Sequence, residues 1–495
     1  MLFGVAEPEL VDVVVVGLGV GGEEVAERLA DAGLSVVGVE RGLVGGECPY
    51  WGCIPSKMMI RAANALAEAR RVDGLAGTAQ VQPDWAPVAK RIREEATDTW
   101  DDTVAAERFI GKGGRLVRGS GRLDGPRRVR VGDQVFEARH GVVLGTGTRP
   151  SVPPIDGLAD TPYWTNHQAI EAEELPESLL VLGGGAIGLE LAQVFARFGS
   201  RVTVLEALDR VLAIEEPEAS EVAAAALRAD GVEIHTGVRA ERVEHDGARF
   251  TVRGGGGAEF TAERLLVVTG RKAHLDELGL DTIGVDASQR FLPVDDRLHV
   301  TDHVWAVGDL TGEGAFTHIA MYQAGIVIAD ILARARQAKA GADASGTSSV
   351  VGGAMGASSA LASSGSSGSA GTVPRADYRA LPRVTFTDPE VGAVGLTEQQ
   401  ARERGINVQV GFTKLGSSTR GWIHRVGDEG FIKLVADADQ GVLIGATSVG
   451  PAGGEVLSAL VVAVHAAVPL SQLRHMIYAY PTFHRAIETA LRDLS

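Results

Sequence analysis

The first part of this chain contains the segment Val11-Asp12-Val13-Val14-Val15-Val16-Gly17-Leu18-Gly19-Val20-Gly21-Gly22, from which its fold can be predicted. The valine run predicts a buried strand, and the three glycines fit the spacing G-x-G-x-x-G. A helix is expected over residues 23–32, and a second strand over residues 35–39 ends in Glu40. In such a unit the pyrophosphate of a dinucleotide lies against backbone N–H groups at the helix start, and the acid binds the ribose hydroxyls.

The same pattern is repeated later in the chain. A strand over 179–182 is followed by Gly183, Gly185 and Gly188, then by a helix over 189–198 and a strand over 201–205 that ends in Glu206. In both copies 23 positions separate the first glycine from the acid. One such glycine motif is weak evidence, but two complete copies predict two dinucleotide-binding domains.

The acid of the second copy predicts which nicotinamide coenzyme binds. Glu206 suits the 2′-hydroxyl of NAD and repels the 2′-phosphate of NADP. Arg201 and Arg210 lie near it in the sequence and could weaken that repulsion. We therefore expect NAD(P)H as the reductant, with NADH favoured.

Both cysteines of the chain lie in Gly45-Gly46-Glu47-Cys48-Pro49-Tyr50-Trp51-Gly52-Cys53-Ile54-Pro55-Ser56-Lys57. Their spacing allows a small disulfide ring. A helix is predicted over 57–70, with Pro55 suited to its first turn, and a helix N-terminus stabilises a thiolate. A metal site needs more ligands than two cysteines without a nearby histidine, so no metal is expected. A chain of 495 residues does not need one structural disulfide. The pair is therefore predicted to be a redox dithiol.

Charge and composition exclude several classes of partner. The chain has 47 basic and 64 acidic residues, a net charge of −17, which argues against nucleic acid and anionic membranes. We see no secretory signal in the first ten residues and no stretch that approaches the ~20 apolar residues of a membrane helix. Two cysteines in a long chain fit a reducing cytoplasm.

A third unit is expected after a break in composition. Of the 31 residues from 341 to 371, 25 are Gly, Ser or Ala, which predicts a flexible linker because so little apolar surface is available for burial. Beyond it, strands are expected over 384–387 and 430–435 and an apolar helix over 456–467.

Together these motifs resemble the class I pyridine nucleotide-disulfide oxidoreductases, such as glutathione reductase, dihydrolipoyl dehydrogenase and mercuric reductase. The segment from Gly45 to Lys57 matches the redox box of that family. The strand 304–307, which ends in Gly308-Asp309, resembles the family strand that touches the flavin. Gly145-Thr146-Gly147 and Thr269-Gly270-Arg271 are glycine turns of the family type, and the segment from Phe386 looks like the start of its dimerisation domain.

The resemblance implies an α/β fold with two Rossmann-like nucleotide-binding domains and a C-terminal α+β dimerisation domain, assembled as a homodimer. The expected divisions are an FAD-binding domain with the redox dithiol (1–155), an NAD(P)-binding domain (156–272), a return to the FAD-binding or central domain (273–340), the linker (341–375) and the dimerisation domain (376–495).

The resemblance also implies roles for single residues. Hydride would pass from NAD(P)H to the flavin, and two electrons from there to the disulfide. Cys53 would hold a thiolate against the flavin, Cys48 would be the exposed thiol that attacks an acceptor, and Lys57 and Glu190 match an ion pair beside the flavin. The residues expected to bind FAD are Gly17, Gly19, Gly22, Glu40, Gly46, Lys57, Gly147, Gly308 and Asp309, and those expected to bind NAD are Gly183, Gly185, Gly188, Glu206 and Gly270.

One family element is altered. The family ends in His-Pro-Thr-x-x-Glu, donated by the second subunit, whereas this chain has Tyr480-Pro481-Thr482-Phe483-His484-Arg485. A tyrosine, with an ordinary pKa of about 10, is a poor base at neutral pH, and Arg485 cannot play the role of the glutamate. His484 would carry the proton only if the loop differs from that of the family. Ordinary turnover of glutathione or lipoamide disulfide is therefore not expected.

The electron acceptor stays open at this point. The leading hypothesis is an unusual disulfide or another thiol-reactive small molecule. The alternatives are a flavin quinone or metal-ion reductase and an enzyme that cleaves a C–S bond, like 2-oxopropyl-coenzyme M reductase, in which the dyad is also replaced. Tyr50 and Trp51 could stack on an aromatic acceptor or pack against the flavin domain.

Overall fold

The computed structural model describes residues 7–346 and 373–495, with side chains described as far as residue 341 in the first range. The chain divides into two compact units. The first consists of Met1–Cys48, Asp101–Arg149 and Lys272–Ala376, and the second of Pro49–Trp100, Pro150–Arg271 and Asp377–Ser495. Each unit is described by itself.

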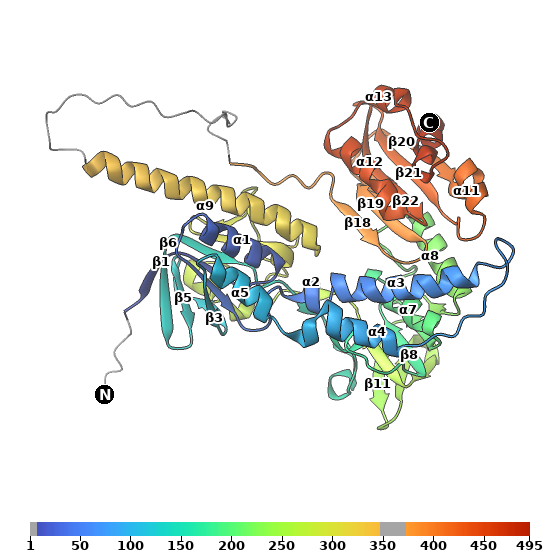
Figure 1. The fold of residues 1–495 in the computed structure, drawn as a ribbon, viewed down its shortest axis with the longest axis horizontal. Helices are drawn as coiled ribbons and strands as arrows, with labels where there is room; N and C mark the ends of the chain where they lie inside the picture. Colours follow the sequence, from blue (N-terminus) through green and yellow to red (C-terminus); the bar gives the residue numbers. More distant parts are fainter. Residues whose placement is uncertain (1–6, 347–372) are drawn as a thin grey trace. The chain divides into compact units, whose positions relative to one another are not determined.

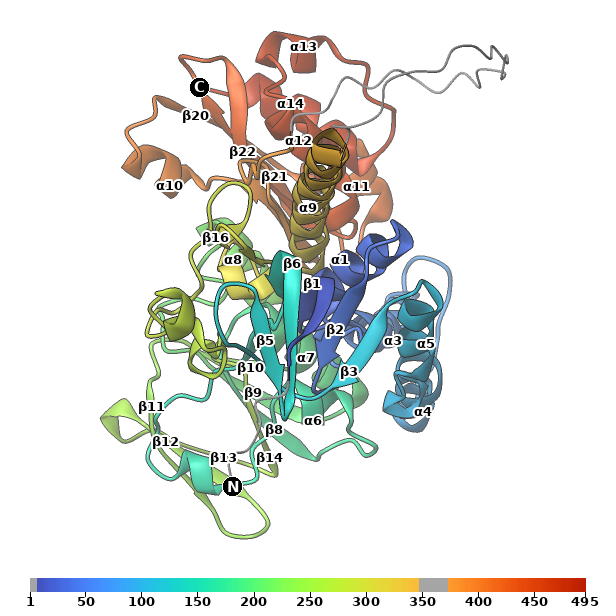
Figure 2. The same cartoon turned by 90° about the vertical axis from the view of Figure 1, so that its left-hand side faces the viewer.

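An eight-stranded sheet forms the centre of the first unit. Its main path runs β16-β17-β6-β1-β2-β3, and all neighbours from β17 to β3 are parallel. Figure 2 shows β6, β1, β2 and β3 in this order, with β5 beside β6. The strands are β1 (Glu9–Val16), β2 (Val36–Glu40), β3 (Arg115–Arg118), β4 (Gly121–Leu123), β5 (Arg128–Val131), β6 (Gln134–Leu144), β16 (His299–Thr301) and β17 (Val304–Ala306).

The valine run of β1 is explained by burial on both faces of this sheet. Val13 and Val15 pack with α1 (Val20–Asp31) and α9 (Thr317–Gly346), while Val14 and Val16 pack on the opposite face. Figure 1 shows α1 and α9 lying alongside each other. A strand covered on both faces carries a continuous apolar run, as in parallel sheets generally. Helix α5 (Thr103–Gly111) also belongs to this unit.

The second unit contains a smaller nucleotide-binding sheet of the same kind. Its four strands, in the order β10-β9-β8-β14, are all parallel. Leu179 and Val181 of β8 pack against α7, and Leu180 and Leu182 pack on the side of a three-stranded sheet. The elements are β8 (Ser178–Leu182), α7 (Ala186–Phe198), β9 (Arg201–Leu205), α8 (Pro217–Ala229), β10 (Glu233–His235), β11 (Ala240–His245), β12 (Phe250–Gly254), β13 (Glu259–Ala262) and β14 (Arg264–Val267).

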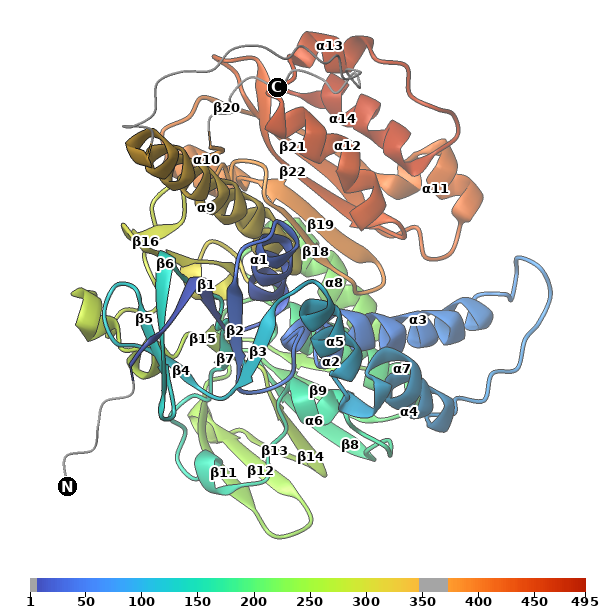
Figure 3. The same ribbon diagram turned by 60° about the vertical axis from the view of Figure 1, so that its left-hand side comes forward.

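The redox segment begins the longest helix of the second unit. Helix α3 (Cys53–Arg70) packs against α7, and α4 (Ala86–Arg91) lies nearby (Figure 3). The short helix α2 (Glu47–Tyr50) precedes it, and α6 (Asn166–Ile170) leads towards β8. Strands β7 (Arg149–Pro150) and β15 (Arg271–Lys272) form a two-stranded sheet.

The C-terminal part of the second unit is a five-stranded antiparallel sheet in the order β18-β19-β22-β21-β20. Helices α12 and α14 pack on it, as Figure 3 shows. The strands are β18 (Pro382–Thr385), β19 (Glu390–Gly395), β20 (Val408–Lys414), β21 (Phe431–Asp437) and β22 (Val442–Gly450), and the helices are α10 (Glu398–Glu403), α11 (Thr419–His424), α12 (Gly453–His465), α13 (Leu470–His475) and α14 (Ala486–Asp493).

This arrangement confirms the predicted α/β class with two Rossmann-like units and a C-terminal α+β domain. Helix α9 continues to Gly346, so the first six residues of the predicted linker are helical, because a Gly- and Ala-rich run can extend a helix that is already nucleated. Residues 347–372 of that segment lie outside the described residues. The five domain boundaries stay predictions. Across the described residues we find no helix with the length and apolar character needed to span a membrane.

Candidate functional site

The two glycine loops have matching geometry. Gly17 has φ +88° and Gly183 has φ +114°, values that residues with a side chain rarely adopt. A Cβ at Gly22 would lie 1.9 Å from the Gly17 carbonyl oxygen, and a Cβ at Gly188 would lie 2.1 Å from the Gly183 carbonyl oxygen. The first and third glycines are therefore required by the tight turn and by the close approach of helix to strand.

The middle glycine of each loop serves a different purpose. A Cβ at Gly19 would come no closer than 3.9 Å to another atom, and nothing lies within 4 Å at Gly185. Both residues are the N-caps of their helices, α1 and α7, and neither helix has a side-chain cap. Open space in front of uncapped helix N–H groups suits the pyrophosphate of a dinucleotide, so both loops fit such a ligand.

The two acids occupy corresponding positions. Glu40 accepts hydrogen bonds from the N–H groups of Leu18 (2.7 Å) and Gly42 (2.7 Å). Glu206 accepts them from Gly184 (2.6 Å) and Leu208 (2.8 Å). Each carboxylate thus lies at the end of the second strand, which is the position of a ribose-binding acid. Its hydrogen bonds also hold the glycine loop in place.

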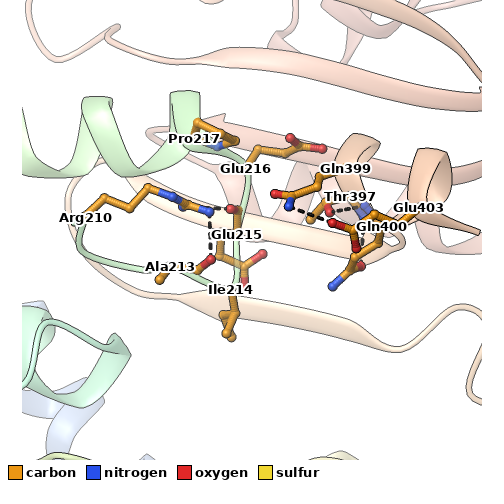
Figure 4. A pocket seen from close by; sticks show the side chains of 10 residues that line it. All are labelled: Arg210, Ala213, Ile214, Glu215, Glu216, Pro217, Thr397, Gln399, Gln400 and Glu403. Atoms are coloured by element: carbon orange, nitrogen blue, oxygen red, sulfur yellow. Dashed lines mark hydrogen bonds between the residues drawn. The ribbon is translucent and has the colours of Figure 1, made fainter. Parts of the chain in front are cut away.

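The arginines near Glu206 are already engaged. The Arg210 guanidinium donates to the backbone carbonyl oxygens of Ala213 (2.7 Å) and Glu215 (2.9 Å), as Figure 4 shows. These residues line a pocket of about 310 Å³. Arg201 begins β9, at the opposite end from Glu206, and pairs with Glu177 at 2.7 Å. Both guanidiniums therefore bind other groups in this structure, and the preference between NADH and NADPH stays a prediction.

The predicted flavin-binding residues of the first unit are held by hydrogen bonds and glycine turns. The Thr148 hydroxyl donates to the Asp309 carboxylate (2.7 Å), and the Gly308 N–H donates to the side chain of buried Gln323 (2.6 Å). Gly147 has φ +61° with nothing within 4 Å of a Cβ. A Cβ at Gly46 would lie 2.8 Å from the Gly19 Cα, so the redox box and the first glycine loop meet at that point.

The dithiol segment spans the start of α3. Cys48 lies on α2 and is half-buried, while Cys53 is the first residue of α3 and is exposed. Cys53 occupies a helix N-terminus, the position that favours a thiolate. The assignment of the two roles stays a prediction.

Lys57 and Glu190 form an ion pair, as the resemblance implied. The Lys57 Nζ donates to the Glu190 carboxylate at 2.7 Å, and Glu190 is 5% exposed. The other Glu190 oxygen accepts from the Phe386 N–H (2.8 Å), and the Lys57 Nζ lies 4.7 Å from the centre of the Phe386 ring. The ammonium group is thereby fixed by three elements, α3, α7 and the segment after β18.

Tyr50 and Trp51 pack against protein. Tyr50 is buried, and Trp51 stacks on the His167 ring, with the ring centres 4.2 Å apart and the planes within 2°. The Trp51 indole N–H donates to Glu171 at 2.7 Å. In this structure Trp51 thus packs against α6, in the range expected for the NAD(P)-binding domain, and stacking on an acceptor stays a prediction.

In the altered C-terminal element, Arg485 contacts several neighbouring residues. The Arg485 guanidinium lies 5.5 Å from the centre of the exposed Tyr480 ring, pairs with Glu488 at 3.0 Å and donates to the Tyr478 carbonyl oxygen at 3.1 Å. His484 is half-buried and lies near the Tyr478 ring, with the ring centres 6.2 Å apart. Arginine, and not His484, therefore lies against Tyr480.

A buried network of charged side chains links α7 and the end of α3 through Asp388. Arg197 is 2% exposed and donates to Asp388 (2.8 Å), which also accepts from Arg71 (2.6 Å). Burial alone would raise the pKa of Asp388, but the Arg197 and Arg71 guanidiniums hold it below the ordinary value. This carboxylate stays ionised at neutral pH.

Sequence reasoning missed Phe386, Glu488, His167 and Glu171 as partners of the predicted site residues. Glu488 has a usable signal, because it follows Arg485 at helical i,i+3 spacing. The others lie more than a hundred residues from their partners, and no local pattern marks such a pairing.

Two nucleotide loops and a dithiol at a helix start define a pyridine-nucleotide flavoprotein. Comparison with known proteins agrees: residues 11–324 match the pyridine nucleotide-disulphide oxidoreductases, and residues 381–491 match the dimerisation domain of those enzymes. The chain belongs to this family of enzymes, which use FAD and NAD(P)H, and the dimerisation domain supports a homodimer.

Named relatives cover nearly the whole chain. A mercuric reductase of Streptomyces lividans is 33% identical over 98% of this chain and 96% of its own length. A dihydrolipoyl dehydrogenase of Haloferax volcanii is 31% identical over 97% and 96%. Among solved structures, the Cu(II) complex of the HOCl-induced flavoprotein disulfide reductase RclA from Escherichia coli has a TM-score of 0.79 and 26% identity, covering 98% of this chain and 99% of that one.

Proposed function

We propose that this enzyme passes electrons from NADH through FAD to the Cys48–Cys53 disulfide and on to a thiol-reactive small molecule that is not a standard glutathione or lipoamide disulfide. The observation that carries the proposal is the combination of an intact dithiol segment with an altered proton-transfer element. Cys48, Cys53 and the Lys57–Glu190 pair are all present, while Tyr480 and Arg485 replace the expected base and acid.

FAD, when bound, accepts hydride from the nicotinamide and delivers two electrons to a disulfide. Residues of this chain would form the environment of the flavin and of the disulfide. Gly19 and Asp309 would bind the pyrophosphate and ribityl parts, and the Lys57 ammonium would stabilise negative charge that develops beside it. Glu190 and the Phe386 ring orient that ammonium. Cys53, at a helix N-terminus, would be held as a thiolate, and Cys48 would attack the acceptor.

We propose NADH as the preferred coenzyme. Glu206 stands at the end of β9, and its two oxygens are fixed by backbone N–H groups at 2.6 and 2.8 Å. Arg210 is held by three carbonyl oxygens and Arg201 by Glu177, so neither guanidinium is directed at a 2′-phosphate. The ratio of kcat/KM for NADH and NADPH tests this, and a preference for NADPH would contradict it.

A metal ion is the second candidate acceptor. It is favoured by the relatives named mercuric reductase and by the solved Cu(II) complex of RclA. The half-reaction that reduces the dithiol is the same for both candidates. They differ in whether Cys48 must form a mixed disulfide or a metal thiolate, so a Cys48→Ser variant alone does not separate them.

The central test is NADH titration of the purified, FAD-loaded protein under anaerobic conditions. Two thiols per chain should appear on reduction, together with the long-wavelength absorbance of a thiolate against oxidised flavin. Cys53→Ser should abolish that absorbance, and Cys48→Ser should show it without reductant. A protein that takes up no FAD, or that shows no reducible bond between the cysteines, contradicts the proposal.

The acceptor itself is found by turnover. Disulfides, quinones, mercuric and cupric ions and thioethers are to be compared with NADH in the unmodified enzyme and in Cys48→Ser. An acceptor that loses its turnover in Cys48→Ser uses the dithiol. Turnover of a quinone that survives the substitution indicates direct transfer from the flavin and overturns the dithiol route.

We further propose that the site is completed in a homodimer within the reducing cytoplasm. Residues 377–495 carry the sheet and helices that match the dimerisation domain. Obligate interfaces of this kind bury more than ~2,000 Å². Sedimentation at micromolar concentration should show a dimer, and a fully active monomer would contradict the proposal.

A further inference from the structure

Trp51, between the two cysteines, is fixed to the protein by three separate contacts. Its ring stacks on His167 with the ring centres 4.2 Å apart, its indole N–H donates to the Glu171 carboxylate at 2.7 Å, and its backbone carbonyl oxygen accepts from the Asn166 side-chain amide at 2.9 Å. All three partners belong to one short stretch, α6 and the residue that follows it.

The stretch that holds Trp51 is itself anchored. The residue before α6, Thr165, caps it and forms a capping box with Gln168. The preceding Trp164 exchanges backbone hydrogen bonds with β14, of 2.7 and 2.8 Å. Ala169 and Ile170 are buried in the core that includes β8 and α7. The stretch that contacts Trp51 is therefore held to the four-stranded sheet by Trp164 before α6 and by Ala169 and Ile170 within it.

Such an anchor affects the chemistry of the pair because closing a disulfide restricts the chain between its ends. The entropy of ordering that chain opposes closure, unless the chain is already ordered in the dithiol form. Only residues 49–52 lie between the cysteines, and Trp51 is one of them. The structure describes the pair without a disulfide between Cys48 and Cys53, so the three contacts of Trp51 already order this segment in that form.

We propose that Trp51 is a positioning residue that holds the segment between Cys48 and Cys53 in place and thereby stabilises the disulfide relative to the dithiol. This inference rests on the proposed redox role of the pair. It gives His167 and Glu171 a role in setting the reduction potential, and it places the anchor of the dithiol in the nucleotide-binding domain.

The FAD-loaded enzyme is equilibrated at fixed pH with mixtures of reduced and oxidised dithiothreitol, without NADH. In this exchange the protein Sγ–Sγ bond breaks, two protein thiols form, and dithiothreitol closes to its cyclic disulfide. Alkylation and mass spectrometry give the dithiol fraction, and the long-wavelength absorbance gives a second reading. Trp51→Ala should shift the equilibrium about tenfold towards the dithiol, which is about 30 mV for a two-electron couple.

Conservative variants separate the three contacts. Trp51→Phe keeps a ring against His167 but loses the N–H donor, so a smaller shift is expected. His167→Phe keeps the stack and should stay near the unmodified value, whereas His167→Ala should not. Trp422→Ala is the matched control, because this tryptophan is 77% exposed on α11 and lies far along the chain from the cysteines.

The outcomes are distinct. A Trp51→Ala or Trp51→Phe protein with lowered thermal stability but an unchanged dithiol equilibrium overturns the inference and leaves Trp51 a structural residue. An equal shift in Trp422→Ala overturns it as well. Absence of any reducible bond in the unmodified enzyme overturns the proposed function together with this inference, and so differs from the first result.

Discussion

Restoring a histidine and a carboxylate at positions 480 and 485 should increase the turnover of ordinary disulfides. General acid–base catalysis typically contributes ~10²- to 10⁴-fold, which is about 2.7–5.5 kcal/mol at ~1.36 kcal/mol per factor of ten. Tyr480→His with Arg485→Glu should therefore raise kcat/KM for oxidised glutathione or lipoamide by up to that range. Reduction of the flavin by NADH, followed by stopped flow, should stay nearly unchanged, because that half-reaction does not use this element.

The structure shows what the double substitution removes. Arg485 pairs with Glu488, and the two side chains are 39% and 18% exposed, so this ion pair contributes only ~0–1 kcal/mol. The contact of Arg485 with the exposed Tyr480 ring adds ~0.5–1 kcal/mol, and its bond to the Tyr478 carbonyl oxygen adds about 1 kcal/mol. A new glutamate at 485 faces Glu488, which retains Arg492 as a partner. The variant should fold with a modest loss of thermal stability.

The assay is steady-state NADH oxidation with each disulfide, in the unmodified enzyme, the double variant and a matched control. Tyr480→Asn with Arg485→Glu makes the same charge change without supplying a base, and should show no gain. If the unmodified enzyme already reduces glutathione or lipoamide disulfide at ordinary family rates, the reasoning from Tyr480 is refuted. His484→Gln is then the variant to examine, because a displaced base would lose its activity there.

Three further perturbations follow from the contacts described above. Gly19→Ala should weaken FAD binding about 10- to 100-fold, because the new Cβ would occupy the open space before the start of a helix. For the same reason Gly185→Ala should raise the KM for NADH by a similar factor, while the FAD content stays normal. Reconstitution titrations measure the affinity for FAD, and steady-state kinetics measure the KM for NADH. Lys433 is buried, and its Nζ lies 3.0 Å from the Glu216 carboxylate. Lys433→Met removes the cation beside that buried carboxylate, so it should lower the free energy of unfolding, measured with denaturant, by about 3–5 kcal/mol. Replacing an exposed lysine by methionine should change that free energy little. The pKa of Asp388 is lowered in the folded state, so its contribution to stability is complete above its ordinary value of 3.8 and is lost as the pH falls through the lowered value; the acid side of the stability profile below about pH 4 should flatten in Asp388→Asn, and an unchanged profile would contradict this assignment.

The nucleotide-binding loops were largely predictable from the sequence. Their glycines, helices and acids are close in the chain, and each requirement is local: a positive φ at Gly17, a missing Cβ at Gly22, an uncapped helix start at Gly19. The alternation of β1 between two buried faces is likewise visible as a valine run. Such features are encoded in spacing and residue type, so the chain order was enough to place them.

The partners of the site residues were decided only by the tertiary structure. The sequence named Lys57 and Glu190 by resemblance, but the Phe386 ring under that ammonium comes from a strand end far along the chain. Trp51 found its partner on α6 and not on the flavin domain, and Arg485 found Glu488 and Tyr480 together. A long side chain can form contacts of similar free energy with several partners, and the packing of the tertiary structure determines which contact forms. Sequence alone therefore determined which chemical groups this enzyme has, while the tertiary structure decided how each group is held, because contacts between residues distant in the chain depend on how the layers pack.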